Sequence, residues 1–146
     1  MAGTTGARRA GAYAGQQTVL VALYSDDRTV RQQVRIALGH KVAADLPELE
    51  FAEFATPAAL LTGLGEQEFD LAILDGEAVP SGGMGLAHQL KDEIEDCPPV
   101  LLLVARPADG WLAAWSRAEA VMQHPVDPIQ LARQVAELLR QDPKNS

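Results

Sequence analysis

The sequence predicts a doubly wound α/β sandwich, in which helices cover both faces of a five-stranded parallel sheet. Five short apolar runs alternate along the chain with segments of helical spacing. Three of these runs are almost continuously hydrophobic, as is typical of parallel strands buried on both faces. The length of 146 residues, with 47% hydrophobic and 22% charged residues, fits one globular domain with a substantial core. Right-handed crossovers then give three layers, with 2-1-3-4-5 as the expected strand order.

The predicted strands are the five apolar runs, at residues 18–24, 49–54, 69–75, 100–105 and 120–123. The run 49–54 (LEFAEF) alternates between apolar and polar residues, which indicates a strand nearer an edge of the sheet. The first, third and fourth runs lack this alternation, so we expect them in the buried part of the sheet.

Helices are predicted in the connections between strands and after the last strand. The first ends near Leu38 and starts where Thr29 and Gln32 have the spacing of a capping box. The second starts at Thr56 and Pro57, which supply an N-cap and a proline for the first turn. The others are predicted at residues 85–95, at 109–117 and after Asp127 and Pro128.

The last helix has the clearest pattern of apolar residues. The residues expected on its inner side are Ile129, Ala132, Val135, Leu138 and Leu139. The connection 39–48, by contrast, is longer than a tight turn needs. Its first half is compatible with an extra helical turn before Pro47.

Composition and charge exclude several classes of function. The net charge is −8 with acids spread along the chain, so no basic stripe can neutralise a phosphate backbone and nucleic acid is not an expected partner. The longest apolar stretch, 100–105, is far shorter than the roughly 20 residues that span a bilayer, so membrane insertion is not expected. The single cysteine, Cys97, cannot form an internal disulfide and no signal peptide is visible, which favours a cytoplasmic location. We expect flexible tails at 1–16 and 142–146 around one domain at 17–141.

Acidic residues follow two of the predicted strands at the point where each strand ends. Ser25, Asp26 and Asp27 come directly after the first strand, and Asp75 ends the third. The carboxyl ends of parallel strands form the binding crevice, and the expected order makes these two strands neighbours. Their carboxylates would repel each other unless a cation joined them, and such hard oxygen ligands suit Mg²⁺. A carboxylate beside Mg²⁺ can also accept a phosphoryl group.

Three segments of the chain resemble the receiver domains of two-component response regulators, of which CheY is the familiar example. The segments are residues 24–34 (YSDDRTVRQQV), 69–86 (FDLAILDGEAVPSGGMGL) and 124–131 (HPVDPIQL), within a resemblance that covers residues 18–140. In receivers these segments hold the acid cluster, the phosphoacceptor, and a lysine followed by proline. The resemblance implies that Asp75 is the phosphoacceptor. It also implies an Mg²⁺ site formed by Asp26, Asp75 and the backbone carbonyl of Glu77.

The chain departs from the receiver pattern at three positions of the site. Arg31 aligns with the family's basic residue in the first helix, which puts Ser25 in the place of the first acid and should lower Mg²⁺ affinity unless Asp27 turns inward. Ala105 stands where receivers have a Thr or Ser that follows the phosphoryl oxygens. His124 replaces the lysine, with a shorter reach and only partial charge near neutral pH. These departures favour a pseudo-receiver over a working phospho-switch.

Several of these residues also fit a purely structural role. Asp75 is compatible with a turn or N-cap aspartate at a strand end, and one of Asp26 and Asp27 is expected to cap the first helix. His124 fits a turn residue before Pro125, across a peptide bond that the resemblance implies is cis. No nucleophile is placed convincingly beside His124, so no catalytic residue is assigned.

Two tryptophans offer a surface for a partner protein. Trp111 and Trp115 are four residues apart and therefore share one face of the helix predicted at 109–117. Either they pack inward on the sheet or they anchor an interface. In receivers the usual interface is formed by this helix, the strand 120–123 and the last helix, and a homodimer through that surface is one form it could take.

The function expected from the sequence is that of a stand-alone response regulator that works by protein contact rather than as a turnover enzyme. Its partner would be a sensor kinase or a target complex, and phosphorylation at Asp75 would be weakened or lost. After Arg140 only QDPKNS remains, so any output is expected to come from another chain. The alternative is a constitutive scaffold or accessory subunit of a larger complex that uses the receiver fold. A flavin carrier is a third reading, but its first strand-helix turn would need amide donors where this chain is acidic.

Overall fold

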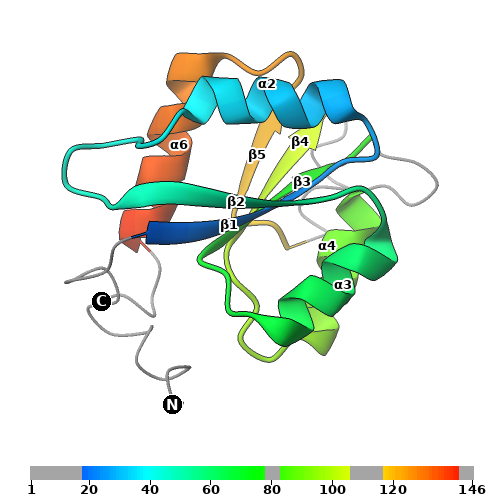
Figure 1. The fold of residues 1–146 in the computed structure, drawn as a ribbon. Coiled ribbons are helices and arrows are strands. Elements are labelled where there is room, and N and C mark those ends of the chain that lie inside the picture. The colour runs from blue at the N-terminus through cyan, green and yellow to red at the C-terminus, as the bar shows by residue number, and fades with distance from the viewer. Residues whose placement is uncertain (1–17, 78–82, 106–116, 142–146) are drawn as a thin grey trace.

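The computed structural model describes residues 18–77, 83–105 and 117–141, whose arrangement is shown in Figure 1. In this part of the chain five parallel strands form one sheet with the order β2-β1-β3-β4-β5. The strands are β1 (Thr18–Tyr24), β2 (Glu48–Phe54), β3 (Leu71–Asp75), β4 (Val100–Val104) and β5 (Ala120–Gln123). All five predicted strands and their order are confirmed, and the observed ends differ from the predicted ones by no more than two residues.

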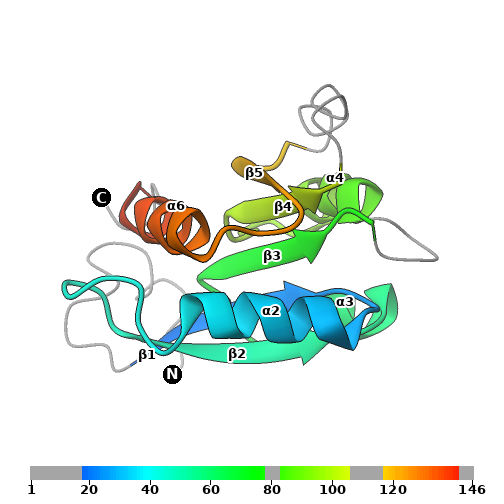
Figure 2. The same ribbon diagram turned by 90° about the horizontal axis from the view of Figure 1, so that it is seen from above.

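Helices cover both faces of this sheet. The described helices are α2 (Arg28–Leu38), α3 (Pro57–Glu66), α4 (Gly83–Glu93) and α6 (Pro128–Gln141). Helices α2 and α6 pack on one face and α3 and α4 on the other, so each face has its own hydrophobic cluster (Figure 2). The predicted three-layer sandwich is confirmed.

The alternation of side chains along each strand decides which helices they meet. In β1, Val19, Val21 and Leu23 belong to the cluster under α2 and α6, whereas Ala22 and Tyr24 belong to the cluster under α3 and α4. Strands β3 and β4 are buried along their whole length, as their continuous hydrophobic runs predict. Strand β2 lies at the edge of the sheet and keeps several exposed residues, also as predicted.

The start of α2 confirms one prediction and corrects another. Asp27 is the N-cap, and its Oδ1 accepts a hydrogen bond from the backbone N–H of Thr29 at 2.8 Å. Thr29 therefore lies inside the first turn, and the predicted capping box of Thr29 and Gln32 is wrong. Asp is preferred over Thr at the N-cap position.

The starts of α3 and α6 follow the sequence. Thr56 caps α3 through a hydrogen bond from the backbone N–H of Ala59 to its Oγ1 at 3.1 Å, with proline in the first turn. Asp127 Oδ1 accepts from the backbone N–H groups of Ile129 and Gln130 at 2.9 and 3.2 Å, ahead of α6.

The inner face of α6 differs from the prediction in its first turn. The buried residues are Leu131, Val135, Ala136, Leu138 and Leu139. Ile129, predicted on this face, is 70% exposed. Two residues correspond to a rotation of about 200° around a helix, so Ile129 and the buried Leu131 lie on opposite sides.

The connection between α2 and β2 contains no helical turn, so the extra turn proposed before Pro47 is wrong. Helix α2 ends at Gly39, which has a φ of 62° and donates its N–H to the carbonyl of Arg35 at 2.9 Å. This left-handed conformation favours glycine and directs the chain out of the helix. The path to β2 then consists of turns and bends, and the N–H of Leu49 donates to the carbonyl of His40 at 2.7 Å.

The remaining predictions about elements have mixed outcomes. Helix α4 starts and ends two residues earlier than the predicted 85–95. Its earlier end agrees with the turn of the chain at 95–96, ahead of the proline pair. Of the helix predicted at 109–117, only Arg117 lies within the described residues, and it is part of a turn. The predicted tails, 1–16 and 142–146, lie outside the described residues.

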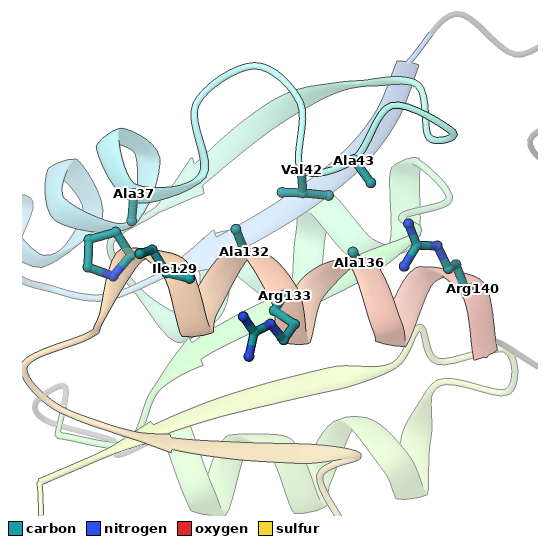
Figure 3. A pocket seen from close by; sticks show the side chains of 9 residues that line it. Ala37, Val42, Ala43, Ile129, Ala132, Arg133, Ala136 and Arg140 are labelled. Atoms are coloured by element: carbon teal, nitrogen blue, oxygen red, sulfur yellow. The ribbon is translucent and has the colours of Figure 1, made fainter.

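Helices α2 and α6 leave a groove between them on one side of the molecule (Figure 3). The groove has a volume of about 490 Å³ and is lined largely by small apolar side chains, with Ile129, Arg133 and Arg140 contributed by α6. None of the residues predicted for the acidic site lines it. Within the described ranges, no helix has the length and apolar character needed to cross a membrane.

Candidate functional site

The carboxyl edge of the sheet brings Ser25 and Asp75 together, as the predicted strand order requires. Strands β1 and β3 are neighbours with Tyr24 opposite Leu74, so the residues that follow meet at the same edge. The hydroxyl of Ser25 donates to Asp75 Oδ2 at 2.7 Å. Both side chains are buried, since Ser25 is 0% and Asp75 3% exposed.

The second oxygen of Asp75 has two further partners. Oδ1 accepts the backbone N–H of Glu77 at 2.9 Å and lies 3.1 Å from Nε2 of His124. His124 follows β5, and its backbone N–H donates to the carbonyl of Val104 at 2.8 Å, which positions the ring at this edge. The His124-Pro125 peptide bond is cis, as the resemblance implied. Three groups of the chain therefore contact the two oxygens of one buried carboxylate.

These contacts set the charge of Asp75 and His124. Burial has the largest single effect on Asp75 and raises its pKa, but His124, the Glu77 N–H and Ser25 together outweigh burial and hold the pKa below its ordinary value. The hydrogen bond to Asp75 raises the pKa of His124, against the opposing effect of burial, and the charges of Asp75 and Glu77 raise it further. The arrangement favours an ion pair of carboxylate and imidazolium.

The two other acids after β1 lie differently. Asp26 is exposed, and Asp27 is exposed and committed to capping α2, so Asp27 does not turn inward to replace the missing first acid. Asp26 remains near the site, because its charge acts on Tyr24: burial first, then the charges of Asp26 and Asp75, raise the pKa of that tyrosine. Ser25 also accepts the backbone N–H of Asp27 at 3.0 Å and so holds this turn together.

Glu77 and Ala105 are brought together by a contact that the sequence did not predict. The backbone carbonyl of Glu77 was the predicted ligand, but the side chain also takes part, since Oε2 accepts the backbone N–H of Ala105 at 3.2 Å. Ala105 is exposed directly after β4 and offers no hydroxyl group. The two residues are 28 positions apart, and no pattern in the sequence signals the contact.

An ion-pair network supports the loop that carries Ser25. Arg31 donates to the carbonyl of Ser25 at 2.6 Å and to Glu53 at 2.9 Å, and Arg35 donates to Glu53 at 2.6 Å. The hydrogen bond from Arg35, and that from Arg31, lower the pKa of Glu53 against the effect of burial. Glu53 was not singled out from the sequence. The available signal was the spacing of Arg31 and Arg35, one helical turn apart and facing an acid on the edge strand.

The predicted metal site has few ligands in this arrangement. Among the described residues, no group of three His, Cys, Asp or Glu side chains lies in a position to hold a metal ion. Asp75 is the one buried carboxylate at the edge, its oxygens already accept hydrogen bonds, and Asp26 is exposed. The predicted set of Asp26, Asp75 and the backbone carbonyl of Glu77 therefore contains one buried and one exposed carboxylate, and this Mg²⁺ site stays a prediction.

The predicted tryptophan interface lies outside the described residues, which include neither Trp111 nor Trp115. The neighbouring strand β5 alternates between half-buried and exposed residues. The interface stays a prediction.

Comparison with known proteins identifies close relatives in sequence. No protein-family model matches the chain. Two curated relatives, both called uncharacterized response regulatory protein, come from two strains of Mycobacterium tuberculosis. Each is 53% identical over 120 residues, which are 82% of this chain and 90% of the relative.

Solved structures with the same fold are response regulators. A putative response regulator from Chloroflexus aurantiacus matches with a TM-score of 0.72 at 18% identity, over 85% of this chain and 99% of the other. The response regulator TrrA from Thermotoga maritima, solved in complex with Mg²⁺ and BeF, matches with a TM-score of 0.67 at 19% identity, over 82% and 98%. The BeF3-activated DrrB receiver domain matches with a TM-score of 0.67 at 19% identity, over 85% and 99%.

At such low identities the structural likeness establishes the fold alone. The relatives at 53% identity, matched over 90% of their length, establish the family. The chain belongs to the CheY-like receiver domains of response regulators, the family of two-component signalling.

Proposed function

We propose that this receiver domain acts as a pseudo-receiver, which signals through contact with a partner protein while phosphorylation of Asp75 is weakened or lost. The observation that carries the proposal is the closed hydrogen bonding of Asp75. One oxygen accepts from Ser25, and the other accepts from Glu77 N–H and lies in contact with His124. Both oxygens of the carboxylate thus have partners within the chain.

Phosphorylation would have to disrupt this arrangement. A carboxylate accepts a phosphoryl group by attacking phosphorus with one of its oxygens, and the incoming charge must be neutralised. At Asp75 the attacking oxygen already accepts at least one hydrogen bond, and the donors that lower the pKa of this carboxylate also make it a weaker nucleophile. The substitutions at Ser25, Ala105 and His124 also remove the second acid, the hydroxyl group and the permanent positive charge that receivers use. Mg²⁺ binding is accordingly proposed to be weak.

Contact with a protein has support outside this site. Ile36 on α2 is 79% exposed and Ile129 on α6 is 70% exposed, on the two helices that line the groove in Figure 3. A groove that is lined largely by apolar side chains, with the exposed Ile129 among them, favours a protein contact. The partner class that the family implies is a sensor kinase or a target complex, and a homodimer through the surface of the helix predicted at 109–117, β5 and α6 stays an alternative. Such partners, together with the single cysteine Cys97, fit a cytoplasmic domain.

Beryllofluoride with Mg²⁺ tests the proposal without a kinase, because beryllofluoride mimics an aspartyl phosphate. Amide NMR spectra of the wild type and of Asp75→Ala would be recorded during a titration at millimolar Mg²⁺. We expect no saturable shifts around Asp26 and Asp75 in the wild type. Saturable shifts that are absent from Asp75→Ala would instead show a working phospho-switch. The TrrA protein, whose complex with Mg²⁺ and BeF has been solved, is the positive control.

A further inference from the structure

The side chain of Glu77 links the loops that follow two neighbouring strands. Its backbone N–H donates to Asp75 Oδ1 at 2.9 Å, while its carboxylate accepts the N–H of Ala105 at 3.2 Å. One residue therefore contacts the buried carboxylate after β3 and the first residue after β4.

The sheet places the Ala105 N–H at the same edge as Asp75. Asp75 pairs with Leu103 in the register of β3 and β4, and the N–H of Gly76 donates to the carbonyl of Leu103 at 2.7 Å. Ala105 lies only two residues further along. Its carbonyl accepts a hydrogen bond from the Gln123 side chain at 3.3 Å, which links it to β5 as well. The Glu77 carboxylate thus accepts a hydrogen bond from a backbone N–H at the carboxyl edge of the sheet.

Glu77 and His124 contact the same oxygen of Asp75. The backbone N–H of Glu77 donates to Oδ1 at 2.9 Å, and Nε2 of the His124 imidazole lies 3.1 Å from this oxygen. A phosphoryl group attached to Asp75 would bring further negative charge to this imidazole. Its oxygens would also seek backbone N–H donors, as phosphate and carboxylate oxygens both do.

We propose that Glu77 is an internal anion that competes with a phosphoryl group on Asp75 for the backbone N–H of Ala105. This inference rests on the proposed function and adds a mode of regulation to it, because a partner that draws Glu77 away from Ala105 would make that N–H available to a phosphoryl oxygen. Glu77 then acts as a positioning residue, through its neighbours rather than through chemistry of its own.

Three variants separate the charge of Glu77 from its contact with Ala105. Glu77→Ala removes both, and Glu77→Gln removes the charge while keeping an oxygen acceptor. Glu66→Gln is the matched control, since it makes the same change of net charge at an exposed position at the C-terminal end of α3. All three keep the backbone carbonyl of residue 77 as a ligand for Mg²⁺. Glu77 is itself exposed, so the variants should fold.

The first readout needs no ligand. In Glu77→Ala the amide resonance of Ala105 should shift and its hydrogen should exchange faster, while Glu66→Gln leaves it unchanged. The second readout is the affinity for beryllofluoride at millimolar Mg²⁺. We expect Glu77→Ala and Glu77→Gln to bind on the order of tenfold more tightly than the wild type, because a like charge has been removed from the site.

An unchanged Ala105 amide in Glu77→Ala, or no gain in affinity in either Glu77 variant, overturns the inference. A failure of this inference can be told apart from a failure of the proposed function. If the wild type binds beryllofluoride weakly and the variants bind no better, the pseudo-receiver stands and the role of Glu77 falls. If the wild type binds tightly and the variants bind still more tightly, the pseudo-receiver falls and the role of Glu77 stands.

Discussion

Ser25 determines one of the contacts of the buried Asp75. Where the receiver pattern has an acid, this chain has a buried hydroxyl group that donates to Asp75 and accepts from the backbone of Asp27. A second carboxylate would repel Asp75 unless a cation lay between them, whereas the hydroxyl stabilises Asp75 without a cation. At this position the chain therefore has an internal hydrogen bond in place of a second carboxylate.

Removing this hydroxyl should destabilise the folded protein. Ser25→Ala leaves a buried carboxylate oxygen and the N–H of Asp27 without their partner, and such losses cost about 1–3 kcal/mol of unfolding free energy. Urea unfolding of the wild type and the variant measures this cost. Thr62→Ala, on an exposed helical position of α3, is a control that should change stability little. A Ser25→Ala variant as stable as the wild type would mean that Asp75 is satisfied in another way.

The pair of His124 and Asp75 should make stability depend on pH in both directions. The pKa of His124 is raised above its ordinary 6.5, so its contribution is complete below that value and is lost as the pH rises through the raised pKa. The pKa of Asp75 is lowered below its ordinary 3.8, so its contribution is present above 3.8 and is lost as the pH falls through the lowered pKa. The pair is intact between these two limits.

His124→Gln should therefore destabilise the protein more at mildly acidic pH than at alkaline pH. NMR titration of the three histidines, His40, His88 and His124, should show His124 with a pKa above 6.5 that falls in Asp75→Asn. A His124 resonance that titrates at or below its ordinary value would contradict the ion pair.

At the scale of the elements, α6 shows where a hydrophobic pattern misleads. The isoleucine in its first turn fits the apolar composition of the helix but lies on the far side from the buried Leu131. The sequence pattern identifies the helix and most of its buried face. It does not identify the phase of the first turn, which depends on how the cap at Asp127 joins the helix to β5.

Alanine substitutions in α6 should separate these two residues sharply. Leu131→Ala removes a fully buried side chain and should cost about 2–5 kcal/mol. Ile129→Ala removes a mostly exposed one and should change stability by no more than about 0.5 kcal/mol. Chemical unfolding of the two variants tests the assignment, and equal losses would place Ile129 in the core after all.

Other features of the elements follow directly from local chemistry. Thr56 and the proline after it mark the start of α3, and the continuous hydrophobic runs mark β3 and β4. The path between α2 and β2 could not be derived in this way. It depends on the left-handed conformation of Gly39. A glycine in a sequence can adopt this conformation but does not have to, so the residue type alone does not predict it.

At the scale of the whole molecule, the fold can be predicted from the sequence because strands and helices have different hydrophobic patterns. Runs buried on both faces predict a parallel sheet, and that sheet places the ends of β1 and β3 side by side. The meeting of Ser25 and Asp75 was therefore predictable from topology alone. The position of His124 came only from the family resemblance, because no period or spacing connects it to Asp75.

Two contacts that distinguish this site were not predicted from the sequence. The bond from Ala105 to Glu77 joins two loops through a side-chain conformation, and the pairing of Glu53 with Arg31 and Arg35 joins a helix to an edge strand. Such contacts depend on the packing of the complete fold. They also show how a receiver can keep its architecture while the buried Asp75 is held by hydrogen bonds within the chain.

Phosphorylation by acetyl phosphate tests this central claim most directly, with intact-mass spectrometry to count the phosphoryl groups. The wild type would be compared with Asp75→Asn and with a triple variant that restores the receiver residues, Ser25→Asp, Ala105→Thr and His124→Lys. We expect the triple variant to gain one phosphoryl group in the presence of Mg²⁺, while the wild type stays at the level of Asp75→Asn. A wild type that is phosphorylated as fully as the triple variant would contradict a weakened or lost phosphorylation of Asp75.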